Sequence, residues 1–155
     1  MLLAILAASV LSSCPVERAE YALRTMPGVT ARFVRVSGDD EWDVGLALRM
    51  HFAATGRSYW WLPWNGGTDG LQHLASTPDP ATKGWRPMQV RPLGDVDFIA
   101  TDARYMLREA VPRPGETAPA HFFIQNLREA MWYRTPQDRR EASSKQFFDL
   151  VRCNR

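Results

Sequence analysis

The sequence predicts an α+β fold, a small antiparallel sheet of roughly five to seven strands with a C-terminal helix packed on it. Three observations predict it. Apolar and polar residues alternate over 44–53, which is typical of a strand with one buried face. Several further apolar runs are separated by Gly- and Pro-containing segments. Residues 135–138 (TPQD) have the features of a helix start: a hydroxyl side chain, a proline and an early acidic residue.

The composition is that of one ordinary globular domain. The chain has 155 residues, of which 45% are hydrophobic and 23% are charged, and its formal net charge is +2. These values exclude a disordered chain and a disulfide-dense miniprotein. So small a net charge gives no reason to expect a nucleic acid as partner. We expect a single domain over 14–155, monomeric and without a membrane span.

The first residues have the character of an export signal. Residues 1–10 (MLLAILAASV) form an uncharged apolar stretch that is too short to span a bilayer and matches the core of a signal peptide. Ser12 and Ser13 suit a cleavage site, although no basic residue precedes Leu2. We predict a signal peptide over 1–13 and a periplasmic or secreted protein. A buried N-terminal helix or strand is the alternative.

The two cysteines, Cys14 and Cys153, lie near opposite ends of the chain. In an oxidising compartment they can form a disulfide. Residues 11–14 (LSSC) also resemble a bacterial lipobox, in which the cysteine is lipidated and becomes the mature N-terminus. Lipidation of Cys14 would leave Cys153 as an odd thiol, so the two outcomes exclude each other. We expect the disulfide, with a structural lipoprotein anchored at Cys14 as the alternative.

The first half of the chain predicts strands joined by turns. The expected elements are a short helix or coil over 15–27, a strand over 31–37, a charged turn over 39–43, a strand over 44–53 and a returning aromatic strand over 58–62. The last two strands form a hairpin.

The hairpin separates two adjacent tryptophans. A loop of two or four residues pairs Met50 with Trp61 and His51 with Trp60. Trp61 then lies in the core, whereas Trp60 shares the other face with His51 and Arg49. A three-residue loop would reverse this assignment.

The second half of the chain predicts a mixture of loops, strands and a helix. The expected elements are a Gly-rich loop over 63–70, a helical turn over 71–76, an irregular segment over 77–87, strands over 88–91 and 96–101, and a loop over 112–119. Residues 121–133 fit either a strand hairpin or a helix. The C-terminal helix is expected to end near Arg152, where a basic residue complements the helix dipole.

Aromatic and polar residues gather at the predicted hairpin and the loop after it. Aromatic rings beside hydrogen-bonding side chains are typical of sites that bind sugars or similar small molecules. The candidate ligand-binding residues are Arg49, His51, Trp60, Trp64, Asn65 and Asp69. In the alternative, the C-terminal helix covers this face and Trp60 belongs to the core.

The sequence contains no pattern that indicates a catalytic or cofactor site. The three histidines, His51, His73 and His121, form no local metal-ligand pair, and we expect no metal and no cofactor. No nucleophile elbow or phosphate-binding loop occurs. Asp95 and Asp97 share one face of a predicted strand, where they fit a solvated edge.

These observations favour an exported envelope domain that binds a partner and catalyses no reaction. The partner is expected to be a small molecule, a glycan or an envelope protein. The alternative is a small hydrolase with an acidic/His cleft, in which Asp95, Asp97 or His121 would act as acid and base.

Overall fold

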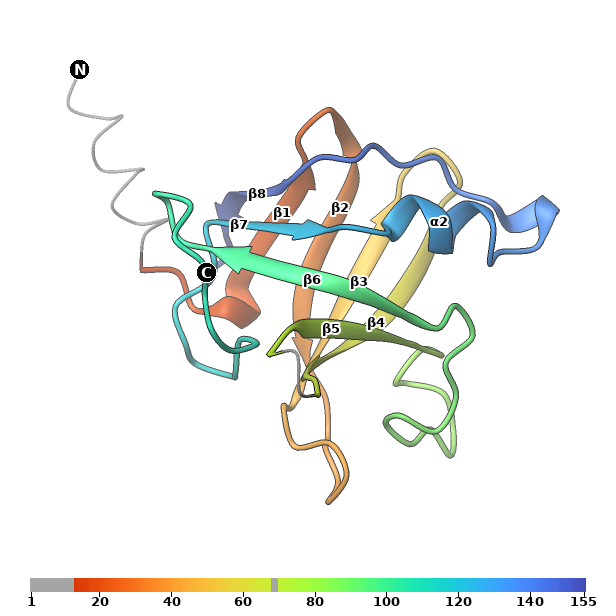
Figure 1. Ribbon diagram of the computed structural model, residues 1–155, viewed down its shortest axis with the longest axis horizontal. Helices are drawn as coiled ribbons and strands as arrows, with labels where there is room; N and C mark the ends of the chain where they lie inside the picture. The colour runs from red at the N-terminus through yellow and green to blue at the C-terminus, as the bar shows by residue number, and fades with distance from the viewer. Residues whose placement is uncertain (1–12, 68–69) are drawn as a thin grey trace.

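A closed antiparallel barrel of eight strands is the central feature of the computed structural model, which describes residues 13–67 and 70–155 (Figure 1). The strands are β1 (Ala19–Leu23), β2 (Met26–Arg35), β3 (Leu46–Phe52), β4 (Arg57–Asn65), β5 (Gln72–Thr77), β6 (Asp95–Thr101), β7 (His121–Ile124) and β8 (Phe148–Cys153). Each strand pairs with the next one along the chain, and β8 pairs with β1. The predicted α+β fold is therefore wrong.

Helical structure in the described residues is limited to short pieces. These are η1 (Val16–Arg18), α2 (Leu127–Trp132) and η2 (Gln137–Arg139). No helix of the described residues is long and apolar enough to cross a membrane. Residues 1–12, which make up nearly all of the predicted signal peptide, lie outside the described residues.

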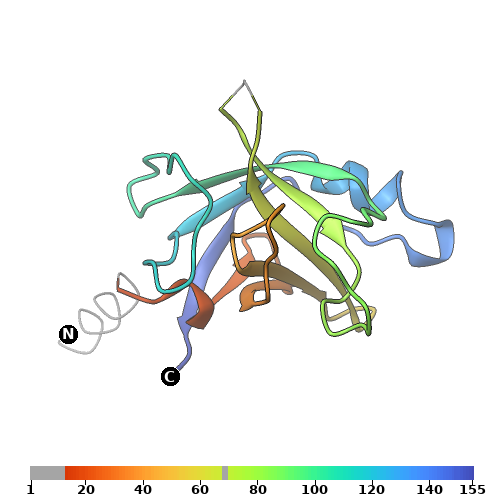
Figure 2. The ribbon, with the colours of Figure 1, turned by 90° about the horizontal axis from the view of Figure 1, so that it is seen from below.

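The strands wrap around a common interior (Figure 2), and aromatic side chains fill it. Tyr21, Phe33, Phe98, Phe122 and Phe148 are all less than 2% exposed. The rings of Phe122 and Phe148 stack with centroids 4.8 Å apart, and the ring of Tyr21 meets Phe122 edge-on at 4.8 Å. An eight-stranded barrel either packs its interior with side chains or encloses a small ligand. Here side chains occupy it.

The predicted C-terminal helix is replaced by strand β8. Its residue Phe148 points into the barrel core, and β8 supplies hydrogen-bonding partners for β1, whose edge would otherwise be open. The helix-start pattern at 135–138 produces only the short η2. The hydroxyl of Thr135 donates to the carbonyl oxygen of Ala130 at 2.8 Å, so it closes the end of α2 rather than capping a new helix.

The middle of the chain contains both confirmed and wrong predictions. The strand predicted over 96–101 is confirmed as part of β6, whereas the helical turn predicted over 71–76 is wrong, because 72–76 belong to strand β5. Residues 88–91 lie in an irregular loop, because the partner edge of β6 is occupied by β5. Residues 121–133 divide between the two alternatives, with strand β7 followed by α2.

The hairpin of β3 and β4 confirms the face assignment of the two tryptophans. Arg49 lies opposite Trp60, and Leu48 lies opposite Trp61. This register differs by two residues from the predicted one, because the loop occupies 53–56 and ends at Gly56, whose φ is +72°. A shift of two residues preserves the faces, so Trp61 is fully buried while Trp60 points outward.

The disulfide between Cys14 and Cys153 is confirmed, with the two Cα atoms 5.7 Å apart and a sequence separation of 139. It lies beside the seam of β1 and β8, where Ala19 pairs with Cys153. A disulfide at Cys14 is incompatible with lipidation of the same sulfur. The bond therefore links the first described residues to the strand that closes the barrel.

A cluster of polar side chains supports the shortest seam of the barrel. Strands β7 and β8 pair through only two residue pairs, one of which joins His121 to Asp149. Nδ1 of His121 lies 2.7 Å from Asp149, and Arg24 donates to both oxygens of the same carboxylate at 2.8 Å. The Arg24 hydrogen bonds hold the pKa of Asp149 below its ordinary value. Side-chain hydrogen bonds thus supplement the backbone pairing at the β7–β8 seam, which has only two residue pairs.

Candidate functional site

A groove of about 730 Å³ lies on the outer face of β2, β3 and β4. The loop over 78–87 forms one of its walls. We call it the outer groove and define it by Arg32, Arg49, Ser58, Trp60, Asp79 and Trp85. All the strand residues of this set occupy outward positions, which alternate with the residues of the barrel core.

Two of the predicted ligand-binding residues, Arg49 and Trp60, line this groove, and a third, His51, lies beside it in an adjoining depression. The guanidinium carbon of Arg49 lies 5.9 Å from the ring centroid of Trp60. Nη2 of Arg49 donates to the hydroxyl of Ser58 at 3.1 Å, and Nδ1 of His51 lies 3.1 Å from the same oxygen. Ser58 therefore fixes the orientation of both basic side chains, while the Trp60 ring remains partly exposed.

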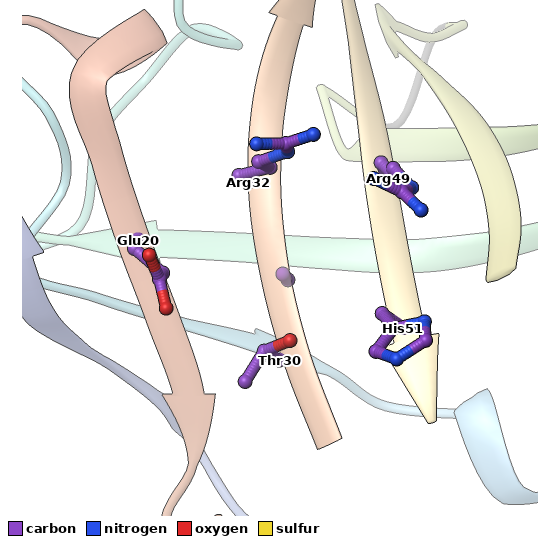
Figure 3. Close-up of a pocket in the computed structure, with 6 residues that line it drawn as sticks. Glu20, Thr30, Arg32, Arg49 and His51 are labelled. Atoms are coloured by element: carbon purple, nitrogen blue, oxygen red, sulfur yellow. The ribbon is translucent and has the colours of Figure 1, made fainter. Parts of the chain in front are cut away.

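A smaller depression of about 310 Å³ adjoins the outer groove at Arg32 and Arg49 and extends across β1, β2 and β3 (Figure 3). Its lining includes Glu20, Thr30, Arg32, Arg49 and His51. In Figure 3 the side chain of Arg32 extends from β2 toward β3, the strand that carries Arg49. Polar side chains thus line a continuous surface beside the Trp60 ring.

Trp60 also borders a second groove of about 550 Å³ on its other side, which we call the lower groove. It is lined by Tyr59, Thr77, Leu93, Arg134 and Arg139, among others, and shares Ser58, Trp60 and Asp79 with the outer groove. The Trp60 side chain therefore separates two hollows and is accessible from both.

Four residues of the outer groove were missed by the sequence analysis: Arg32, Ser58, Asp79 and Trp85. Arg32 belongs to the outward face of a predicted strand, but only the β2–β3 register shows that it lies opposite Arg49. Trp85 belongs to an irregular loop, and its indole N–H donates to the hydroxyl of Thr77 at 2.7 Å. The alternation over 31–37 could have indicated Arg32, whereas no local signal places Trp85.

Trp64 and Asn65 lie away from the outer groove. The Trp64 ring packs on the imidazole of His73 with centroids 4.8 Å apart, and the Arg91 guanidinium lies 5.9 Å from its centroid. Oδ1 of Asn65 accepts a hydrogen bond from the backbone N–H of Val111 at 3.0 Å. Asp69 lies outside the described residues. The structure therefore brings together Arg49, His51 and Trp60 from the predicted set.

The acidic and histidine residues of the hydrolase alternative do not converge. Asp95 pairs with Arg91 at 2.7 Å, Asp97 pairs with His73 at 3.2 Å, and His121 pairs with Asp149. The paired residues of β6 and β7 place His121 opposite Thr101, at the far end of β6 from both aspartates. Within the described chain, no group of three or more His, Cys, Asp or Glu side chains is placed to hold a metal ion.

Comparison of the chain with protein-family models, with curated proteins and with solved structures finds no match.

Proposed function

We propose that this protein is an exported envelope protein that binds a carbohydrate in the outer groove and catalyses no reaction. The observation that carries the proposal is the placement of Trp60. Its ring is partly exposed, borders both grooves and lies beside the hydrogen-bonding groups of Arg49, His51 and Ser58. Sugar rings present apolar faces and a rim of hydroxyl groups, so a flat indole edged by polar side chains suits them.

The shape of the site favours a narrow ligand over a protein partner. The loop over 78–87 forms a wall that makes the surface concave, and Trp85 stands on that wall. Protein interfaces are typically broad patches, whereas small-molecule sites are concave. Because no C-terminal helix covers this face, the groove is open to a ligand.

The disulfide and the N-terminal sequence support an exported location. Disulfides persist in oxidising compartments such as the periplasm and the extracellular space. Cys14 directly follows the predicted signal peptide over 1–13, so cleavage before it would leave the bond intact.

Replacing Trp60 with alanine is expected to abolish carbohydrate binding with little loss of stability. The ring supplies the stacking surface, and its outward position makes it a minor part of the core. Binding of wild type and Trp60→Ala should be compared on an array of neutral and acidic oligosaccharides. Truncation of a stacking aromatic costs roughly 2 kcal/mol or more, a loss of about thirtyfold in affinity.

Trp64→Ala is the matched control for this experiment. It removes the same side chain from the same strand, at a position that packs on His73 outside both grooves. Binding should persist in this variant. Equal binding by wild type and Trp60→Ala, or equal loss in both variants, contradicts the assignment of the site to Trp60.

The intact mass of protein isolated from its native host tests the proposed export. The mature chain should begin at or just before Cys14 and gain two mass units on reduction of its disulfide. A full-length chain with free thiols would contradict export, and a diacylglyceryl adduct on Cys14 would contradict the disulfide in the mature protein.

A further inference from the structure

We infer that the ligand is an acidic carbohydrate, an oligosaccharide with carboxylate groups on rings on either side of Trp60. This inference rests on the proposed carbohydrate site and names the class of its ligand. It is carried by three arginines that line the two grooves and form no ion pair within the described residues: Arg32, Arg49 and Arg139.

Two of these arginines face each other across neighbouring strands. Arg32 of β2 lies directly opposite Arg49 of β3, and like charges in this position repel. Glu20 lies opposite Arg32 on the other side, but its carboxylate accepts a hydrogen bond from Arg152 at 2.9 Å. The Arg32 side chain extends toward β3 (Figure 3), so a carboxylate bound there would meet two guanidinium groups and reduce their repulsion.

The Arg49 side chain is already ordered in a position to make such a contact. Its hydrogen bond to Ser58 and its position beside the Trp60 ring restrict its movement before any ligand binds. A donor that is already ordered loses less conformational entropy on binding. A sugar ring stacked on Trp60 would bring a substituent at its edge within reach of Arg49.

The positive charge continues into the lower groove. Arg139 is exposed there, while its neighbour Arg134 is engaged by Glu129 and by the carbonyl oxygens of Leu93 and Asp95. Cationic groups on both sides of one tryptophan match a chain that repeats its acidic group from ring to ring.

Asp79 is the single carboxylate among the described lining residues of the two grooves. One of its oxygens accepts a hydrogen bond from the backbone N–H of Ala81 at 2.9 Å. Three unpaired arginines outnumber this one acid, so the combined surface favours an anionic ligand.

The test compares acidic oligosaccharides with their neutral counterparts. Oligomers of galacturonate, glucuronate and mannuronate are arrayed beside their carboxyl-reduced forms, which keep the rings and lose the charge. Wild type should bind an acidic oligomer at least about tenfold more tightly than its reduced form, and added salt should weaken only the acidic interaction. Arg32→Gln should weaken acidic binding by about tenfold and weaken neutral binding by less, so that the ratio of acidic to neutral affinity falls.

Arg104→Gln is the charge-matched control. Arg104 is exposed in the turn after β6, outside both grooves, so its loss should change affinity by less than about twofold. Equal binding of acidic and reduced oligomers would overturn the acidic ligand and leave the carbohydrate site standing. Binding of none of these oligomers, acidic or reduced, would overturn both. An acid preference that Arg32→Gln does not lower would overturn the role of the paired arginines.

Discussion

Removing the Cys14–Cys153 disulfide is expected to lower the free energy of unfolding by about 4–5 kcal/mol. The bond closes a loop across 139 positions, nearly the whole described chain, so it removes a large number of conformations from the unfolded state. It also holds the chain ends beside the β1–β8 seam, which no turn connects. The double variant Cys14→Ser/Cys153→Ser should be compared with wild type by equilibrium denaturation in guanidinium chloride.

Reduced wild type is the control for the serine substitutions. It should unfold at nearly the same denaturant concentration as the double variant, because both lack the same cross-link. A loss below about 1 kcal/mol would mean that chain entropy of the unfolded state is not the main contribution of this bond.

Trp61→Ala is expected to destabilise the protein by about 3–5 kcal/mol, in contrast to the neighbouring Trp60→Ala. Trp61 is completely buried and is the largest of the side chains that are less than 2% exposed, so its truncation leaves a cavity that the surrounding strands can fill only in part. Thermal and denaturant unfolding of the two alanine variants, measured together, give the comparison.

Trp61→Phe is the matched control for size and shape. The indole N–H of Trp61 is buried without a hydrogen-bond partner among the described residues, and phenylalanine removes this donor while keeping an aromatic ring. The phenylalanine variant should therefore lose much less stability than the alanine variant. Similar losses in Trp60→Ala and Trp61→Ala would contradict the assignment of the two faces of β4.

The sequence predicted the local strands better than the closure of the barrel. The alternation over 44–53 is strong enough to identify β3. The predicted faces of Trp60 and Trp61 are correct despite a register shift of two residues, because side chains alternate along a strand. The C-terminal strand was missed because its partner, β1, lies about 130 positions away. A local helix-start pattern at 135–138 contains no information about such a distant edge.

The candidate site was also predicted only in part, because the sequence indicates local pairing and not distant contacts. Arg49, His51 and Trp60 come from one hairpin, so local pairing places them on one face. Arg32 could be assigned to the site only with the register between β2 and β3 known. Trp85 could be assigned to it only with the path of an irregular loop known. Trp64 follows Trp60 on the same face of β4, but the twist of the strand and its pairing with His73 carry it out of the groove.

The filled interior of this barrel has a consequence for how its specificity can evolve or be redesigned. On β3, Leu48 and Met50 point into the core, while Arg49 and His51 point to the outer face that carries the proposed site. Selection for stability and selection for recognition therefore act on different, interleaved codons of the same strand. New ligand preferences can arise by exchanging outward side chains while the inward ones keep the scaffold folded.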